Sequence, residues 1–326
     1  MTFPRRSVLA AGAAALAMPR VAFAQGASAQ AYPSRNVRFI CGFPPGSSPD
    51  LVARLAGQWL SDTLGQPFVI ENRPGAASNI ATDAVAHSPA DGYTLLMSVL
   101  TNVFNTTLYT KLNFNFASDF IHVAGIANAP YVIVVPLSFP AKTVPEFIAY
   151  AKANPGKINM ASGGTGSSSH IFGEEFKAMA GVDIVHVPYR GNYMPDLMAG
   201  EVQMAVNPMP QALELVRSNK IRALAVTTKA RQASLPDVPT VAESGLPDYK
   251  YDAWFAVMAP AGTPKPILDK VSGDIAKILQ IPDVAEKLTR QGVDIVYSTP
   301  EKFDAVLKAD VERNSAILRA AGVGGQ

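Results

Sequence analysis

The sequence contains few residues of the kinds that form disulfides, bind metals or transfer protons. It has a single cysteine, Cys41, so no internal disulfide can form. Cys41 lies inside a short apolar run, where a cysteine is expected to be a buried core residue. The four histidines, His87, His122, His170 and His186, have no spacing typical of metal ligands. No nearby pair of carboxylates marks an acid/base site. We therefore expect no metal site, no cofactor and no catalytic residue.

Charge and long apolar runs are also scarce. Charged residues make up 17% of the chain, with 28 Lys and Arg against 26 Asp and Glu. No basic run or charged tail is present, so nucleic acid and an acidic membrane surface are not expected as partners. The one long apolar run, Val8–Met18, is too short to span a bilayer.

Residues 1–24 have the pattern of an export signal. Arg5 and Arg6 precede the apolar run, and Ala22-Phe23-Ala24 is an A-x-A cleavage signal. The paired arginines are typical of twin-arginine export, with Sec export as the alternative. Cleavage would remove three arginines and no acid, leaving 25 basic and 26 acidic residues and a net charge of −1. We expect a soluble, exported protein located in the periplasm.

The remaining chain alternates between short apolar runs and amphipathic runs, which predicts an α/β fold. Its length of about 300 residues exceeds one ordinary core, so two domains are expected. The expected strands cover residues 37–43, 68–71, 92–99, 131–135, 158–161, 183–187, 202–207, 221–227 and 254–258. The expected helices cover residues 51–64, 79–86, 143–153, 264–280, 282–291 and 300–320, with two more ended by Gly181 and Gly200.

The stretch Pro44–Asp50 joins the first expected strand to the first expected helix. Ser48 can cap that helix, Pro49 suits its first turn, and Asp50 adds negative charge where the helix dipole favours it. The first N–H groups of a helix have no partner inside it, so they form a potential anion site. Gly46 would let a ligand approach the backbone closely. The alternative is that this stretch is only a well-capped connection.

A second such loop, Ala161–His170, again follows a strand and opens a helix. Three glycines and five hydroxyl residues between Ser162 and His170 exceed the needs of a turn. If the two domains face each other, two helix N-termini point into one cleft, where a small anion can be held by N–H groups and hydroxyls. A turn at Tyr189-Arg190-Gly191 adds a third element to this expected cleft.

Enzyme motifs are absent from these loops. The second loop lacks the lysine of a P-loop, and it matches neither G-x-G-x-x-G nor G-x-S-x-G. Ser167 and His170 are close enough in sequence for a Ser–His contact, but no acid stands at a spacing that would orient the histidine. His170 is interpreted as a capping or packing residue rather than a base.

The chain resembles a known family, the periplasmic solute-binding proteins of tripartite tricarboxylate transporters, or Bordetella uptake gene family. The resemblance covers nearly the whole chain after residue 24, in order. Its segments are Phe43-Pro44-Pro45-Gly46-Ser47 with Asp50, Leu64-Gly65-Gln66-Pro67, Glu71-Asn72-Arg73-Pro74-Gly75-Ala76, Pro89-Ala90-Asp91-Gly92-Tyr93-Thr94-Leu95-Leu96, Pro140-Ala141-Lys142-Thr143-Val144, Ala153-Asn154-Pro155-Gly156-Lys157, Val187-Pro188-Tyr189-Arg190-Gly191, Leu224-Ala225-Val226-Thr227, Leu235-Pro236-Asp237-Val238-Pro239-Thr240-Val241 and Ala259-Pro260-Ala261-Gly262-Thr263-Pro264.

The resemblance implies a two-domain, type II periplasmic-binding-protein fold of the α/β class, with a ligand cleft between the lobes. It implies one lobe of residues 31–128 and 253–326 and another of residues 129–252. By position it implies ligand-binding residues in both loops, in the third element and at two strand ends: Phe43, Pro45, Gly46, Ser47, Asp50, Thr101, Ser162, Gly164, Thr165, Gly166, Ser167, His170, Tyr189, Arg190, Gly191 and Asn207. The chain departs from the family at Ser48, which replaces a second glycine, at Val206-Asn207, often Phe-Asp, and in a shortened Gly191–Asp196 segment.

The implied function is capture of a small carboxylate in the periplasm and its delivery to membrane permease subunits by a monomeric protein that is not an enzyme. Two alternatives are also compatible with the sequence. The chain could bind a ligand for a sensor partner without transport, or it could be an exported Ser/His hydrolase.

Overall fold

The computed structural model describes residues 32–290 and 292–320. The strands are β1 (Val37–Cys41), β2 (Phe68–Asn72), β3 (Thr94–Val99), β4 (Phe120–Pro136), β5 (Asn159–Ser162), β6 (Val185–Pro188), β7 (Met204–Pro208), β8 (Ile221–Val226), β9 (Asp252–Pro260) and β10 (Asp294–Ser298). The helices are α1 (Ser48–Leu64), α2 (Asn79–Ala86), α3 (Leu100–Leu108), α4 (Val144–Ala153), α5 (Ser168–Ala180), α6 (Met194–Ala199), α7 (Met209–Arg217), α8 (Lys265–Ile278), α9 (Pro282–Arg290) and α10 (Pro300–Ala320), with a short 3-10 turn η2 (Ala76–Ser78).

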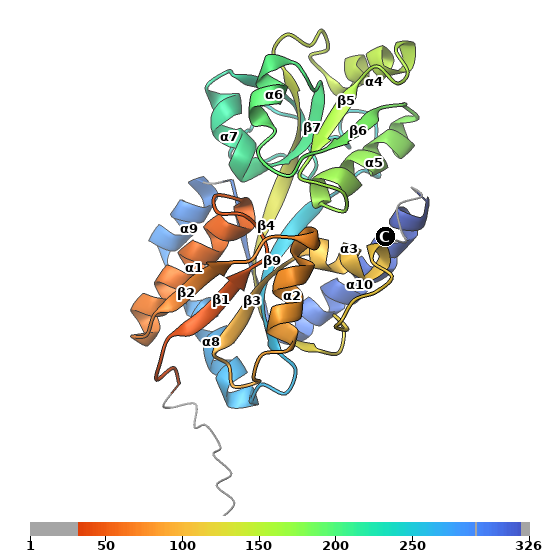
Figure 1. Ribbon diagram of the computed structural model, residues 1–326. Helices are drawn as coiled ribbons and strands as arrows, with labels where there is room; N and C mark the ends of the chain where they lie inside the picture. Colours follow the sequence, from red (N-terminus) through yellow and green to blue (C-terminus); the bar gives the residue numbers. More distant parts are fainter. Residues whose placement is uncertain (1–31, 291, 321–326) are drawn as a thin grey trace, which may run out of the picture.

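The elements form two lobes joined by two long strands (Figure 1). In the first lobe the strand order is β2-β1-β3-β9-β4, with β10 on the other side of β4. Strands β1, β2 and β3 pair in parallel, while β9 is antiparallel to β3 and β4. Apolar residues of α1, α8 and α9 belong to one core cluster, and those of α2, α3 and α10 to another. The sheet is therefore covered by helices on both faces, as its parallel strands β1, β2 and β3 require.

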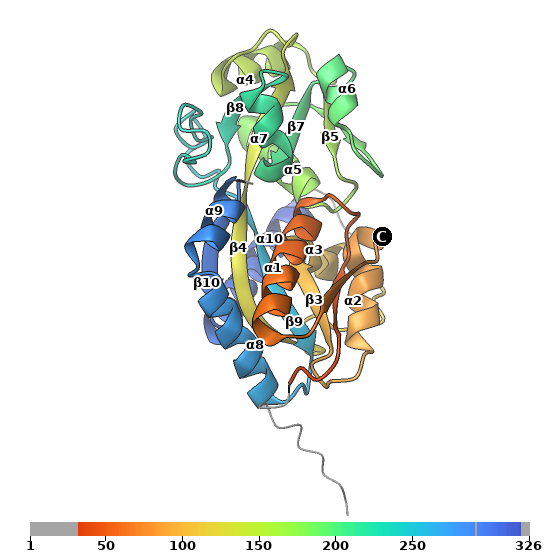
Figure 2. The same cartoon turned by 90° about the vertical axis from the view of Figure 1, so that its left-hand side faces the viewer.

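Strand β4 belongs to both lobes (Figure 2). It pairs with β9 from Phe120 to Pro130, and with β7 and β8 from Tyr131 to Pro136. The second sheet continues in the order β4-β7-β5-β6, with β5 parallel to both of its neighbours. We retain, as a proposal, lobe boundaries at residues 31–128 with 253–326 and at residues 129–252. Residues 1–31, the expected signal included, lie outside the described residues.

Most of the expected elements are confirmed, with differences at their ends. The expected strand at 131–135 is wrong in length, because β4 begins at Phe120 and runs for 17 residues. Helix α1 begins at Ser48 rather than after Asp50, and Ser48 is therefore not its cap. Helices α3 and α7 and strand β10 were not expected from the sequence. No helix in the described part of the chain is both long and apolar enough to cross a membrane.

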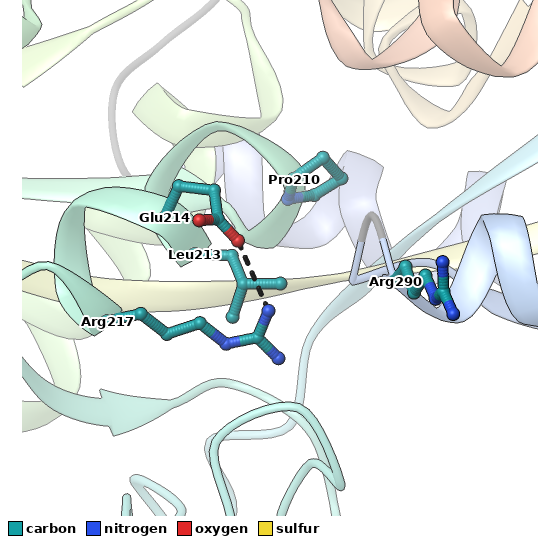
Figure 3. Close-up of a pocket in the computed structure, with 5 residues that line it drawn as sticks. All are labelled: Pro210, Leu213, Glu214, Arg217 and Arg290. Carbon is teal, nitrogen blue, oxygen red and sulfur yellow. Dashed lines mark hydrogen bonds and ion pairs between the residues drawn. The ribbon is translucent and has the colours of Figure 1, made fainter.

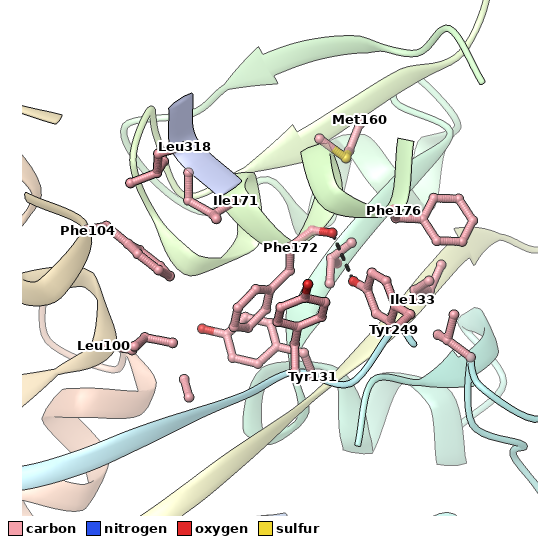
Figure 4. Packing of buried hydrophobic residues seen from close by; sticks show 14 of the residues in the cluster. Leu100, Phe104, Tyr131, Ile133, Met160, Ile171, Phe172, Phe176, Tyr249 and Leu318 are labelled. Carbon is pink, nitrogen blue, oxygen red and sulfur yellow. Dashed lines mark hydrogen bonds between the residues drawn. The ribbon is translucent and has the colours of Figure 1, made fainter. Parts of the chain in front are cut away.

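One apolar cluster continues from the first lobe into the second (Figure 4). Phe104 of α3 and Phe172 of α5 meet edge to face, with ring centroids 6.4 Å apart. Tyr131 of β4 packs against the same Phe172 ring at 4.9 Å. Tyr249 donates a hydrogen bond from its hydroxyl to the Phe172 carbonyl at 2.9 Å. The lobes thus share a buried aromatic contact, which fixes α3 against α5.

We expect Phe104→Ala to lower the free energy of unfolding by about 3–5 kcal/mol, because it removes a fully buried ring from the contact between the lobes. Urea denaturation followed by circular dichroism measures this loss. Phe104→Leu is the matched control and should lose distinctly less. Equal stability of Phe104→Ala and the wild type would contradict the packing described here.

Candidate functional site

The first loop, Phe43–Ser47, is held by a buried carboxylate. Asp50 is 1% exposed, and its Oδ2 accepts the Gly46 N–H at 2.8 Å and the Arg54 Nε–H at 3.0 Å. Its Oδ1 accepts from Asn72 Nδ2 at 2.7 Å, and the same Asn72 amide donates to the Phe43 carbonyl at 2.9 Å. Burial would raise the pKa of Asp50, but the hydrogen bonds from Arg54, Asn72 and Gly46 together lower it below its ordinary value.

This network changes the interpretation of the first loop. The Asp50 carboxylate is used within the protein, so we assign it to bracing the loop rather than to contact with a ligand. Ser47 does not cap α1 through its side chain, because its hydroxyl donates to the Pro44 carbonyl at 2.7 Å. Gly46 has a φ of +80°, which favours glycine, and its amide already donates to Asp50.

The second loop is held in a similar way by its own side chains. Ser162 Oγ accepts the Gly164 N–H at 3.2 Å, and His170 Nδ1 accepts the Gly166 N–H at 3.1 Å. Ser167 caps α5, since its Oγ accepts the backbone N–H of His170 at 3.3 Å and donates to the Gly164 carbonyl at 2.7 Å. The ring of His170 therefore bonds to Gly166 and not to Ser167.

The first turns of α3 and α5 meet between the lobes. Thr101 Oγ1 lies 3.4 Å from Ser168 Oγ, and both side chains are buried. A Cβ on Gly166 would come within 2.6 Å of Leu108 Cδ1, so the second loop also lies against the end of α3. Burial raises the pKa of Tyr131 to about 12, while a hydrogen bond with Ser168 acts to lower it. The structure thus brings Thr101 to the second loop.

The donors left over for a ligand lie in the first turns of α1 and α5. The N–H groups of Ser48, Ser168 and Ser169 have no i−4 acceptor within their helices. No other acceptor for these three amides is present in the described part of the chain. Ser48 is 2% exposed, and its hydroxyl is buried with no hydrogen-bond partner among the described residues. Unpaired buried polar groups are costly, so these groups favour a polar ligand or water beside them.

The third element is a turn after β6. Tyr189 donates from its hydroxyl to Asp196 Oδ2 at 2.7 Å, and its backbone N–H donates to the Ser162 carbonyl at 3.0 Å. These bonds attach the turn to the second loop. Arg190 and Gly191 are exposed, and Arg190 has no hydrogen bond or ion pair within residues 32–290 and 292–320.

The remaining candidates are placed differently. Asn207 is fully buried at the end of β7, where it accepts from the Tyr193 hydroxyl and donates to the Pro208 carbonyl at 3.0 Å. Pro45 and Thr165 are exposed, while Phe43 is partly buried. Over the described residues, no hydrogen bond joins the first loop to the second. The structure therefore unites the second loop with Thr101 and Tyr189, and leaves the first loop without a direct hydrogen bond to them.

The turn before α2 contains three consecutive residues with positive φ that are not glycine. Ala76, Ala77 and Ser78 have φ values of +45°, +51° and +78°, a left-handed conformation that costs free energy for residues with a Cβ. Asn105 of α3 holds this turn by donating to the Ala77 carbonyl at 2.7 Å. The strained turn is thus fixed by α3, the helix that also reaches the second lobe.

A cavity of about 290 Å³ lies elsewhere, between α7 and α9 (Figure 3). It is lined by Arg217 and Arg290 together with Pro210, Leu213 and Glu214. Arg217 pairs with Glu214 at 3.2 Å, and Arg290 pairs with Glu286. Because each arginine already has a carboxylate on its own helix, this cavity offers no unpaired positive charge, and none of the candidate residues lines it.

No group of three or more His, Cys, Asp or Glu side chains among the described residues could hold a metal ion. Cys41 is fully buried as a free thiol, and burial raises its pKa to about 12.

Four residues of the site were not expected from the sequence: Asn72, Arg54, Ser168 and His186. Ser168 could have been found from its place in the first turn of α5, and Arg54 from its position four residues after Asp50 on α1. Asn72 and His186 are joined to the loops only by the tertiary structure.

A comparison with protein families matches residues 52–323 to the model of the tripartite tricarboxylate transporter family receptor, TctC. The chain belongs to the TctC family. This match includes both lobes and the second loop, and the first-loop motif lies just before it.

Solved structures agree with the TctC assignment. The protein Rpa4515 of R. palustris with adipate is 34% identical, with a TM-score of 0.86 over 90% of this chain and 99% of the other. The periplasmic binding protein BugD is 31% identical, with a TM-score of 0.84 over 90% of this chain and 100% of the other. MatC of Rhodopseudomonas palustris with bound malate is 30% identical, with a TM-score of 0.82 over 88% of this chain and 100% of the other. The expected type II two-lobe binding-protein fold is confirmed.

We expect Asp50→Asn to lower the free energy of unfolding at neutral pH by about 1–3 kcal/mol, because Asp50 is a buried, charged acceptor. The pKa of Asp50 is depressed in the folded protein, so its contribution is complete above the unfolded value of 3.8 and is lost as the pH falls through the folded value. Urea titrations at pH values on both sides of that range measure the free energy of unfolding of both proteins. The difference in this free energy between wild type and Asp50→Asn should become smaller in acid. A difference that grows in acid would contradict the assigned role of Asp50.

Proposed function

We propose that this protein captures a small carboxylate between its lobes in the periplasm and delivers it to membrane permease subunits of a tripartite tricarboxylate-type transporter. The observation that carries the proposal is the meeting of the α3 and α5 first turns, beside the unpaired amides of Ser168 and Ser169. Helix N-termini favour anions through these amides and through the helix dipole. The adipate and malate held by two relatives of the same fold support a carboxylate ligand.

The ligand is recognised mainly by backbone amides and hydroxyls rather than by a fixed positive charge. Neither loop contains lysine or arginine, and Arg190 is the one basic residue of the third element. Arg190 is exposed, so solvent screens its charge and limits its contribution. Ser48 Oγ and the first-turn amides are buried or unpaired, which makes them the stronger donors. The candidate contacts Ser47, Ser162, Gly164 and Thr165 supply the surrounding loop backbone.

The alternatives are distinguished by other observations. A sensor module without transport would use the same site, and the presence of small permease genes beside this gene would favour transport. A hydrolase based on Ser167 and His170 lacks support in the geometry, since the His170 ring bonds to Gly166. We propose that the protein has no catalytic turnover, acts as a monomer and requires no cofactor.

Thermal-shift screening over dicarboxylates, aromatic acids and amino acids identifies the ligand class, because a ligand of the native state raises the melting temperature.

With a confirmed ligand, we expect Arg190→Ala to weaken binding at most moderately, by up to about 10- to 150-fold if it makes a direct hydrogen bond. Gly166→Val should abolish binding, because its φ is +81° and its side chain would collide with Leu108.

Calorimetric titration measures both variants, with circular dichroism to confirm folding. Gly273→Ala is the control, because a Cβ there meets no atom within 4 Å. If Arg190→Ala abolishes binding while Gly166→Val folds and binds normally, a salt bridge holds the ligand and the proposed recognition is wrong.

We also propose that residues 1–24 direct export and are removed, on the evidence of the paired arginines and the A-x-A signal. Mass spectrometry of the protein isolated from the periplasm should show a chain that begins near residue 25. An intact Met1 terminus on periplasmic protein would rule the cleavage out.

A further inference from the structure

Two imidazole rings from different elements stack beside the second loop. His170 of α5 and His186 of β6 have ring centroids 3.8 Å apart and ring planes 17° apart. The parallel register pairs Met160 with His186, so His186 and Ser162 lie on the same face of the sheet, the face that α5 covers. His170 is 4% exposed and His186 is partly buried.

Each ring is connected to a different part of the loop. His170 Nδ1 accepts the N–H of Gly166 at 3.1 Å. His186 Nε2 lies 2.7 Å from Ser162 Oγ, which in turn accepts the N–H of Gly164 at 3.2 Å. Gly164 and Gly166 have φ values of +109° and +81°, so the loop backbone adopts conformations that local sequence alone fixes weakly. His170 accepts the Gly166 N–H directly, and His186 contacts Ser162, which accepts the Gly164 N–H, so the two rings together hold one loop conformation.

This arrangement favours neutral rings. A ring nitrogen that accepts an N–H carries no proton, and two protonated rings stacked this closely would repel each other. Burial, with smaller effects of His186 and Lys177, lowers the pKa of His170 to about 3. Burial also lowers the pKa of His186. The charged side chains that face the rings are Glu174 and Lys177 of α5, which pair with each other at 2.8 Å.

The loop that the rings hold leads directly into the site. Gly166 lies against Leu108 of the first lobe, and the next residues of α5, Ser168 and Ser169, carry the unpaired amides. A displacement of Gly166 would therefore move both the contact between the lobes and the donors for a ligand.

We propose that the stacked His170–His186 pair is a neutral clamp that positions the second loop for ligand capture. Both histidines are then positioning residues, and His186 acts through Ser162 rather than by touching the ligand. The role in capture rests on the proposed function, whereas the effect on the loop can be measured without any ligand.

Hydrogen exchange of the Gly166 amide, followed by NMR on ligand-free ¹⁵N-labelled protein, tests the clamp. His170→Phe keeps an aromatic ring but removes the acceptor, and His170→Asn places an oxygen near the position of Nδ1. We expect exchange at Gly166 to be at least about tenfold faster in His170→Phe and within about twofold of the wild type in His170→Asn. His186→Phe, with His186→Gln as its conservative partner, repeats the comparison at Gly164 if His170→Phe does not fold.

Affinity for adipate and malate, used as probes, should fall about tenfold in the phenylalanine variants and recover in the conservative ones. His122→Asn is the control, because His122 is a buried histidine of the first lobe that pairs with Asp304, away from the loop. It should change neither Gly166 exchange nor affinity. Equal exchange at Gly166 in the wild type and His170→Phe would overturn the clamp. If no acid in the screen binds the wild type, the proposed function fails, while the exchange comparison still decides the clamp.

Discussion

The antiparallel pairing of β4 with β9 sets the geometry of both lobes. The two strands pair from Phe120–Pro260 to Pro130–Asp252, and β4 then continues into the sheet of the second lobe. Each lobe is therefore built on a strand that the other lobe also uses. Strands β1, β3 and β5 end near this junction and lead into helices, so that helix first turns from both lobes can meet. The Thr101–Ser168 contact is the direct result.

Side chains of the protein hold the glycine amides of both loops. The Asp50 carboxylate accepts a hydrogen bond from the Gly46 N–H. In the second loop, Ser162 Oγ accepts the N–H of Gly164, and His170 Nδ1 accepts the N–H of Gly166. This reduces the conformational entropy that ligand binding would have to remove. It also moves the expected ligand contacts from the glycines to the helix residues that follow them. In the proposed site an anion is bound without a buried cation, which avoids the desolvation of a charged pair.

Elements with a local signal could be predicted from the sequence, and elements that depend on packing could not. Helix α1 follows an apolar strand and a Pro/Gly/Ser loop, so its place was clear. Helix α3 begins directly at the end of β3 without glycine or proline, and its asparagines and threonines are poor helix formers. It is stabilised instead by the burial of Phe104 and by the Asn102 side chain, which accepts the Val99 N–H at 2.9 Å. The burial of Phe104 depends on contact with the other lobe, and the Asn102 contact, although local, follows a valine rather than the Ser, Thr, Asp or Asn that marks a helix start.

The candidate site shows the same division. The glycines and hydroxyls of the second loop were evident, since their number exceeds what a turn needs. Asn72 and His186 were not, because they reach the loops across strands that only the fold places side by side. The left-handed turn at Ala76–Ser78 was also unpredictable, since residues with a Cβ disfavour that conformation and Asn105 of a distant helix holds it.

We propose that the carboxylate is bound by the first-turn amides of α1 and α5. This binding mode can be tested by NMR of ¹⁵N-labelled protein during titration with adipate, malate or the acid found by screening. We expect the amide signals of Ser48, Ser168 and Ser169 to move together and furthest, since hydrogen bonds to an anion form there. Shifts confined to the exposed turn at Arg190, with these three amides unchanged at saturation, would contradict it.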